Sequence, residues 1–262
     1  TVSDGVRVMQ PVFGGLYSVP LVGYQGHVIP VILAVWLMCR IETWLHRVVP
    51  AMFDLFVTPL VSVFVTGYLT LAAIGPVFTM LENSIITGVQ ALITLPYGIG
   101  SFLVGGLYAV TVVVGVHHMY AMIDLGQLAR YGRTFWLPLA SAANVAQGGA
   151  AFAVALKTRD PKLRSMALPS ALSACMGITE PAIFGVNLRC FRPFLGGLVG
   201  GACGAWYASI AGLSATGTGV TGIFGILLHL NMPLQYLFMM ALSFGVSFAV
   251  TWIIWKPEEV KA

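Results

Sequence analysis

Residues 177–189 read Gly177-Ile178-Thr179-Glu180-Pro181-Ala182-Ile183-Phe184-Gly185-Val186-Asn187-Leu188-Arg189 and lie between long apolar stretches. This stretch contains Glu180, which is the only acidic residue between Asp160 and Glu258. An ionisable group inside a membrane-type sequence is costly, so it marks a binding site or an ion pathway. The alternative is a carboxylate near a membrane surface, neutral or paired with Arg189. The following Pro181 also predicts that the helix is broken here.

Composition predicts an all-α integral membrane protein. Of the 262 residues, 58% are hydrophobic and 8% are charged, whereas a soluble domain has about 25% charged residues. The net charge of +4 comes from short cationic clusters that suit orientation in a membrane rather than nucleic-acid binding. The four cysteines form no Cys-x-x-Cys pair, and we expect them to be small buried apolar residues rather than disulfides or metal ligands.

Apolar runs predict a multi-span helical transporter. The helices expected to cross or enter the membrane are 28–39, 55–81, 85–94, 102–116, 136–156, 194–213 and 233–255. Residues 41–49 have an amphipathic pattern that predicts a separate helix in the membrane interface, with His46 on its solvated face. Residues 214–225 are rich in Gly and Thr and predict a loop or a broken helix.

The cationic clusters predict a re-entrant hairpin around Glu180. Lys157 to Arg164 is the densest cationic run, which favours a cytoplasmic loop. Arg189 and Arg192 form the next cluster. If both clusters lie on the cytoplasmic side, residues 165–188 must enter the membrane and return, with Gly177 to Pro181 near the tip. Broken helices of this kind form the binding sites of transporters.

A second polar group is the pair His117-His118, which follows Gly115-Val116. Adjacent residues point in different directions on a helix, so we expect no zinc site. The imidazoles can hydrogen-bond a polar ligand or exchange protons near neutral pH. The alternative is two interfacial histidines where a helix ends.

Residues 177–187 closely resemble a signature of enzyme IIC, the membrane component of the bacterial phosphoenolpyruvate-dependent sugar phosphotransferase system, in its glucose, sucrose and β-glucoside group. The motif Gly115 to His118 lies upstream in the order of that family, and Asn144 to Gly149 is also similar. Gly23 to Gly26, followed by Val28 to Val31, most resembles the sucrose branch. The resemblance covers essentially the whole chain.

The resemblance implies that the domain binds a sugar, for which sucrose is the expected substrate, and carries it across the bacterial inner membrane in an elevator-like movement. A phosphocysteine on an enzyme IIB domain then phosphorylates the sugar. The implied catalytic residues are Glu180 and His118. The implied substrate-binding residues are His117, His118, Thr179, Glu180 and Asn187. Further implied partners are enzyme IIA, the phosphocarrier protein, membrane lipid and a second copy in a homodimer; no cofactor is expected.

The chain departs from the complete family pattern in two ways. It has no Cys in the Cys-x-x-Thr-Arg-x-Arg context of a IIB domain, and the family's membrane domain extends further at its N-terminus. No signal peptide is evident after Thr1. We therefore expect residues 1–262 to be an N-terminally truncated IIC domain without IIB or IIA, which alone phosphorylates nothing.

A different class of function fits the same polar residues. In an ion-coupled secondary sugar transporter, Glu180 and the two histidines would form a proton relay. A structural membrane subunit without a substrate site would leave Glu180 unexplained.

Overall fold

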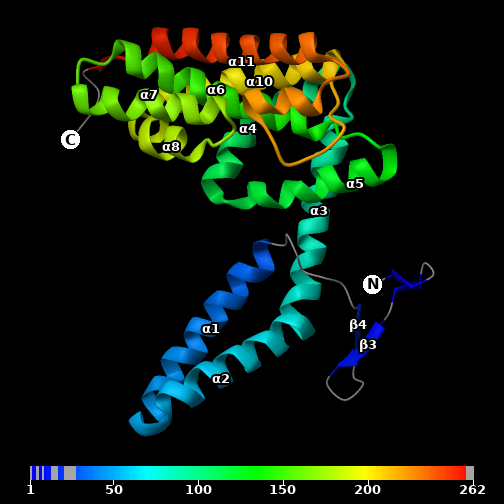
Figure 1. Ribbon diagram of the computed structural model, residues 1–262. Coiled ribbons are helices and arrows are strands. Elements are labelled where there is room, and N and C mark those ends of the chain that lie inside the picture. Colours follow the sequence, from blue (N-terminus) through cyan, green and yellow to red (C-terminus); the bar gives the residue numbers. More distant parts are fainter. Residues whose placement is uncertain (1, 4–5, 8, 13–16, 21–27, 258–262) are drawn as a thin grey trace. The chain divides into compact units, whose positions relative to one another are not determined.

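The computed structural model describes residues 2–3, 6–7, 9–12, 17–20 and 28–257. The chain divides into two compact units, residues 1–87 and 88–262, which we describe separately. Figure 1 labels the helices and strands of each. Helices predominate in both, as the composition predicts. Four helical stretches of the described chain are long and apolar enough to cross a membrane, and they are Ala51–Phe78, Pro96–Val114, Trp136–Lys157 and Pro233–Ile254.

The first unit begins with two short antiparallel pairs of strands that the sequence did not predict. β1 (Val2–Ser3) pairs with β2 (Val6–Arg7), and β3 (Met9–Val12) pairs with β4 (Tyr17–Pro20). The helix α1 then runs without interruption over Val28–Val48. The predicted separate interfacial helix over 41–49 is therefore wrong. Arg40 continues the helix because arginine is a good helix former. Its guanidinium lies over the ring of Trp36 one turn earlier, 5.5 Å from the ring centre.

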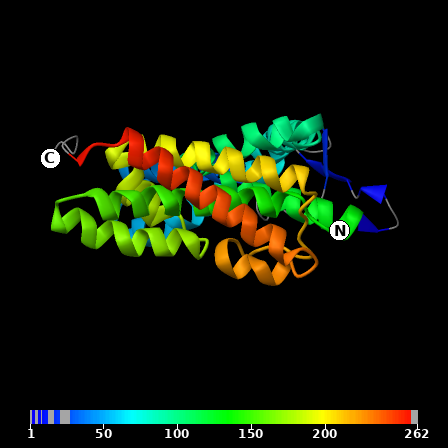
Figure 2. The same cartoon turned by 90° about the horizontal axis from the view of Figure 1, so that it is seen from above.

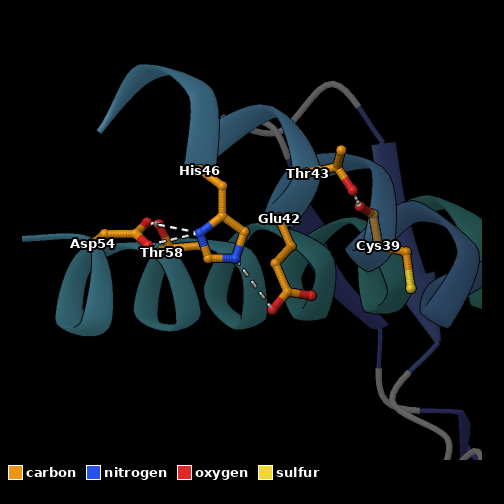
Figure 3. Close-up of polar contacts among 6 residues, drawn as sticks. All are labelled: Cys39, Glu42, Thr43, His46, Asp54 and Thr58. Carbon is orange, nitrogen blue, oxygen red and sulfur yellow. Dashed lines mark hydrogen bonds and ion pairs between the residues drawn. The ribbon is translucent and has the colours of Figure 1, made fainter. Parts of the chain in front are cut away.

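Polar contacts join the end of α1 to α2 (Ala51–Leu69), as Figure 3 shows. His46 Nδ1 lies 2.8 Å from both carboxylate oxygens of Asp54, and Thr58 Oγ1 donates to Asp54 at 2.6 Å. Glu42 lies 3.9 Å from the other imidazole nitrogen. His46 is exposed, as predicted, but it is partnered. Because solvent reaches both side chains and screens their charges, the pair orients the two helices more than it stabilises them.

The predicted span 55–81 is built from several pieces. α2 passes into the π-helix η2 (Thr70–Ile74) and then into α3 (Gly75–Ile93). The prediction of a separate helix over 85–94 is wrong, because residues 85–93 belong to α3. Pro59 lies inside α2 rather than near a helix end. The wide π turn directly precedes Pro76, whose missing N–H and bulky ring disrupt regular α-helical bonding.

The second unit contains the longer helices α4 (Ile99–Val114), α6 (Trp136–Lys157), α7 (Pro161–Cys175), α10 (Arg192–Ile210) and α11 (Pro233–Ile254). The shorter pieces are η3 (Pro96–Gly98), η4 (Val116–Tyr120), α5 (Ala121–Tyr131), α8 (Glu180–Ala182), η5 (Ile183–Asn187), α9 (Leu188–Cys190) and η6 (Gly222–Leu228). The predicted loop or broken helix over 214–225 is irregular as far as residue 221 and then enters η6, whereas the predicted span 194–213 ends earlier, at Ile210. Of the four cysteines, Cys190 is buried but Cys39 is exposed, so the prediction that all are buried is wrong.

Small residues bring α6, α10 and α11 close together, and Figure 2 shows α10 and α11 side by side. Ser243 Oγ donates to the carbonyl oxygens of Ala142 at 2.6 Å and Gly200 at 3.0 Å. A Cβ placed on Gly200 would lie 2.5 Å from Ser247 Cβ. The glycines of α10 therefore permit the close approach of α11. α6 lies at the centre and is buried along nearly its whole length.

The two cationic clusters lie at the same end of the second unit. Lys157 Nζ donates to the carbonyl oxygens of Trp252 and Trp255 at 2.5 and 2.6 Å, and Arg192 donates to Ile254 at 2.8 Å. Both cations therefore meet the C-terminal end of α11, where unpaired carbonyls favour positive charge. The chain between the clusters leaves this end and returns to it, as the hairpin prediction requires. Which side of the membrane this end faces stays a prediction.

Candidate functional site

The hairpin carrying Glu180 consists of α7, a turn at residues 176–179, and the returning segment α8–η5–α9. Asp160 caps the start of α7 by accepting a hydrogen bond from the Lys162 amide at 2.9 Å. On the returning arm, Ala182, Val186 and Cys190 recur every four residues and join one apolar cluster with residues of α6 and α7. The small alanines of this cluster let the two arms lie close to α6.

The turn at the tip is closed by its own hydrogen bonds. The amides of Gly177 and Ile178 donate to the carbonyls of Ala174 and Ser173, each at 3.0 Å, and Ser173 Oγ donates to the Ile178 carbonyl at 2.9 Å. Gly177 has φ of 101°, a conformation that other residues rarely adopt. The predicted break is confirmed, but it precedes Glu180. Pro181 falls in the first turn of α8, where its missing N–H costs nothing.

Glu180 and Thr179 have different surroundings at this tip. Glu180 is exposed, so its carboxylate is open to a ligand. Thr179 is 5% exposed, and its carbonyl accepts the Ile183 amide at 2.9 Å. The predicted contact of Thr179 with a substrate stays a prediction.

The histidine pair follows α4 directly. Gly115 ends α4 with φ of 83°, and Val116–Tyr120 forms the tight helix η4. The rings of His117 and His118 lie 4.0 Å apart with 37° between their planes. The expectation that the two side chains diverge is therefore wrong. The helical winding does not account for this, because consecutive residues of a 3₁₀ helix lie about 120° apart around its axis, further than the roughly 100° of an α-helix.

The electrostatics of His117 connect the histidines with the hairpin tip. Burial lowers the pKa of the His117 imidazole, the neighbouring His118 lowers it further, and the negative charge of Glu180 raises it. The imidazole is therefore neutral at pH 7. Its Nδ1 atom is buried and has no hydrogen-bond partner among the described residues. Glu180 and His117 thus come within electrostatic reach, although 62 residues lie between them in the chain.

Asn187 occupies a different place from Glu180. It is 0% exposed, and its Nδ2 donates to the carbonyl oxygen and to Oε1 of Gln147 at 3.0 and 2.8 Å. The side chain therefore fastens η5 to α6. A substrate contact by Asn187 stays a prediction.

Two polar residues at the tip were not among the predicted site residues. Asn144 on α6 is 7% exposed, and its Nδ2 donates to Thr221 Oγ1 at 2.9 Å. Thr221 in turn lies directly against the turn, since a Cβ on Gly177 would be 2.6 Å from Thr221 Oγ1. The sequence feature that could have indicated Asn144 is its polar amide inside the apolar span 136–156. Among the described residues, no three His, Cys, Asp or Glu side chains are placed to hold a metal ion.

Comparison with known proteins identifies the family. Residues 10–201 match the family described as Phosphotransferase system, EIIC, and this range includes both the histidine pair and Glu180. No solved structure matches the chain.

Several curated relatives are similar over most of the chain. A sucrose-specific EIIBC component of Salmonella typhimurium is 41% identical over 91% of this chain and 53% of its own length. One from Klebsiella pneumoniae is 44% identical over 87% of this chain and 50% of its length. A trehalose-specific EIIBC component of Bacillus subtilis is 36% identical over 80% of this chain and 45% of its own length. The chain thus spans about half the length of these relatives. From the match over 10–201 and the four apolar helices, the chain belongs to the EIIC family of the phosphotransferase system and is a multi-pass membrane protein.

Proposed function

We propose that this chain is the sugar-translocating domain of a phosphotransferase-system permease, with sucrose as its substrate. The observation that carries the proposal is that the region matching the family, residues 10–201, contains both Glu180 and the histidine pair, and that the charge of Glu180 acts on His117. The names of the relatives support the sugar, because those at 41% and 44% identity are sucrose-specific.

The residues at the tip suit sugar recognition. The exposed carboxylate of Glu180 accepts hydrogen bonds from sugar hydroxyls. A neutral His117 donates one hydrogen bond and accepts another, so it pairs with a hydroxyl in either sense. The exposed His118 adds a second imidazole beside it. We assign these three side chains the contacts nearest the hydroxyl that becomes phosphorylated.

The chemical step transfers a phosphoryl group from the phosphocysteine of a IIB domain. The sugar hydroxyl oxygen forms a bond to phosphorus, the phosphorus–sulfur bond breaks, and the cysteine leaves as a thiolate. Glu180 accepts the hydroxyl proton as the oxygen attacks. This transfer depends mainly on the positioning of the two reactants. His118 would orient the same hydroxyl.

The proposed partners follow from this chemistry. The names of the relatives support a IIB domain as the direct phosphoryl donor. We further propose that IIA and the phosphocarrier protein reload that cysteine, and that the domain works as a homodimer surrounded by membrane lipid. Ion-coupled transport with a proton relay has no support in the comparisons.

The test uses a bacterial strain that lacks its own sucrose uptake system. The gene that contains this chain is expressed with a IIB domain and the carrier proteins, and labelled sucrose, trehalose and a β-glucoside are supplied separately. We expect sucrose phosphate to accumulate and to require the phosphocarrier protein. Accumulation of free sugar that is abolished by a proton uncoupler would refute the proposal.

A further inference from the structure

The helix α5 carries a buried carboxylate, Asp124, which is not among the proposed sugar contacts. Asp124 is 4% exposed, and its oxygens accept hydrogen bonds from two threonines, Thr134 Oγ1 at 2.5 Å and Thr218 Oγ1 at 3.0 Å. Burial raises the pKa of this carboxyl, and the two hydroxyls oppose the shift. A buried ionisable group of this kind needs partners, and both of its partners lie on other segments.

Thr218 belongs to the loop 211–229, here called the brace loop, which connects α10 to α11. Ala215 exchanges backbone hydrogen bonds with Thr134 at 2.8 and 2.9 Å, so the loop is joined to the start of α6 at the same place as to Asp124. The first part of the brace loop is therefore bonded to the stretch from α5 to α6, which directly follows the histidine pair.

The other end of the brace loop is held by α11. Tyr236 Oη donates to the Gly222 carbonyl at 2.6 Å, and its ring stacks on the fully buried His229 at 4.1 Å. His229 Nδ1 donates to the Gly225 carbonyl at 2.7 Å. These contacts leave residues 221 and 222 in a defined position.

That position is against the tip of the Glu180 hairpin. A Cβ on Gly222 would lie 2.3 Å from the Cys175 carbonyl oxygen and 2.7 Å from the Gly177 nitrogen. The brace loop therefore touches the backbone of the turn that leads to Glu180. The histidines are held separately, since Tyr120 at the end of η4 packs on Trp136 of α6 with ring centres 4.6 Å apart.

We propose that Asp124 is a positioning residue, which fixes the brace loop against the hairpin tip and thereby sets where Glu180 stands relative to the histidine pair. In this proposal Asp124 acts through the brace loop and makes no contact with the sugar itself. Its role in catalysis rests on the proposed function, but the mechanical role does not. An Asn at position 124 retains both contacts, because its oxygen accepts from one threonine and its amide donates to the other.

The first test measures position rather than activity. Spin labels are attached at two exposed residues, Leu125 on α5 and Phe184 on η5, in the full protein with its native cysteines replaced and in lipid vesicles. The distance distribution between the labels is compared for Asp124→Ala, Asp124→Asn and Thr218→Val. The matched control is Thr216→Val, since Thr216 is exposed and its hydroxyl bonds only within the brace loop, to the Leu228 carbonyl.

We expect a narrow distribution in the unaltered protein, a broad one in Asp124→Ala, and a partly broadened one in Thr218→Val. Asp124→Asn and Thr216→Val should remain narrow. A distribution that is equally narrow in Asp124→Ala and Thr218→Val overturns the proposal. So does one as broad in Asp124→Asn as in Asp124→Ala, because the charge rather than the two hydrogen bonds would then be responsible. If Asp124→Ala does not fold, Thr218→Val decides.

The second test measures phosphorylation with the IIB domain and carriers present. Misplacement of a reacting group by about 1 Å costs on the order of 10²-fold in rate, so Asp124→Ala should lower kcat by about that factor while Asp124→Asn restores most of it. A normal kcat in Asp124→Ala, together with a broadened distance distribution, refutes the catalytic part. If the unaltered protein phosphorylates no sugar, the proposed function fails, and the spin-label distances still decide the mechanical role.

Discussion

Replacing Gly222 by Ala should disable the sugar site through a backbone contact alone. Gly222 has φ of 68°, and a Cβ there would lie 2.3 Å from the Cys175 carbonyl oxygen and 2.9 Å from the Met176 carbonyl carbon. Ordinary contact requires roughly 3.5 Å, so the hairpin tip must retreat by about 1 Å. These neighbours are backbone atoms of the closed turn, which cannot rotate away as a flexible side chain can.

Gly212 provides a matched control for the backbone conformation. It lies in the same loop with φ of 64°, but a Cβ there would meet nothing within 4 Å. The left-handed conformation costs a non-glycine residue about 1–2 kcal/mol at either position. We expect Gly212→Ala to show that loss of stability alone. Gly222→Ala should add a loss of phosphorylation on the order of 10²-fold from the displaced tip.

The assay combines thermal unfolding in detergent with initial rates of sugar phosphorylation in vesicles, using the complete set of phosphotransferase proteins. Protein that is correctly inserted is quantified separately, so that a lower yield is not counted as a lower rate. Equal phosphorylation rates in Gly212→Ala and Gly222→Ala would refute the reasoning, because the contact between the brace loop and the hairpin tip would then have no bearing on the site.

Three further predictions concern the hairpin and the histidines. Glu180→Gln should lower phosphorylation by about 10²–10⁴-fold and sugar binding much less, if the carboxylate accepts the proton; equal losses in both would assign it to binding alone. Burial lowers the pKa of His117, whereas the charge of Glu180 raises it. In a His118→Gln background, Glu180→Gln should therefore move the midpoint of His117 modification by diethylpyrocarbonate to lower pH. A shift of this midpoint to higher pH would contradict the reasoning. Single cysteines at positions 162 and 192 should both react with an impermeant thiol reagent from the cytoplasmic side, and labelling from opposite sides would exclude the hairpin.

Local pattern predicted much of the architecture because lipid imposes a simple rule on sequence. A backbone in hydrocarbon must satisfy its hydrogen bonds within a helix, so long apolar runs such as 136–156 and 233–255 correspond closely to α6 and α11. Charge was equally informative. The cations at Lys157 and Arg192 predicted a chain that leaves and returns to one end, and both bind the C-terminal end of α11.

Local pattern was less informative where helix breaks are decided by neighbouring turns. The apolar pieces 55–81 and 85–94 form one path through a π-helix, because a proline can be absorbed by a wider turn as well as by an interruption. The histidine pair was expected to diverge, yet the rings lie together after the glycine turn at 115. Neither outcome depends on residue type alone.

The sequence by itself determined three things: that this is a helical membrane protein, where its chain turns back, and that Glu180 is a single acid among apolar residues. It could do so because composition, charge and the helix-breaking Gly and Pro residues are local properties of the chain. Only the tertiary structure decided which distant groups meet. It placed Glu180 within electrostatic reach of His117, locked Asn187 onto Gln147, and laid Thr221 against Gly177. Such meetings depend on how closely helices can pack, and that distance is set jointly by small residues on several segments rather than by any one stretch of sequence.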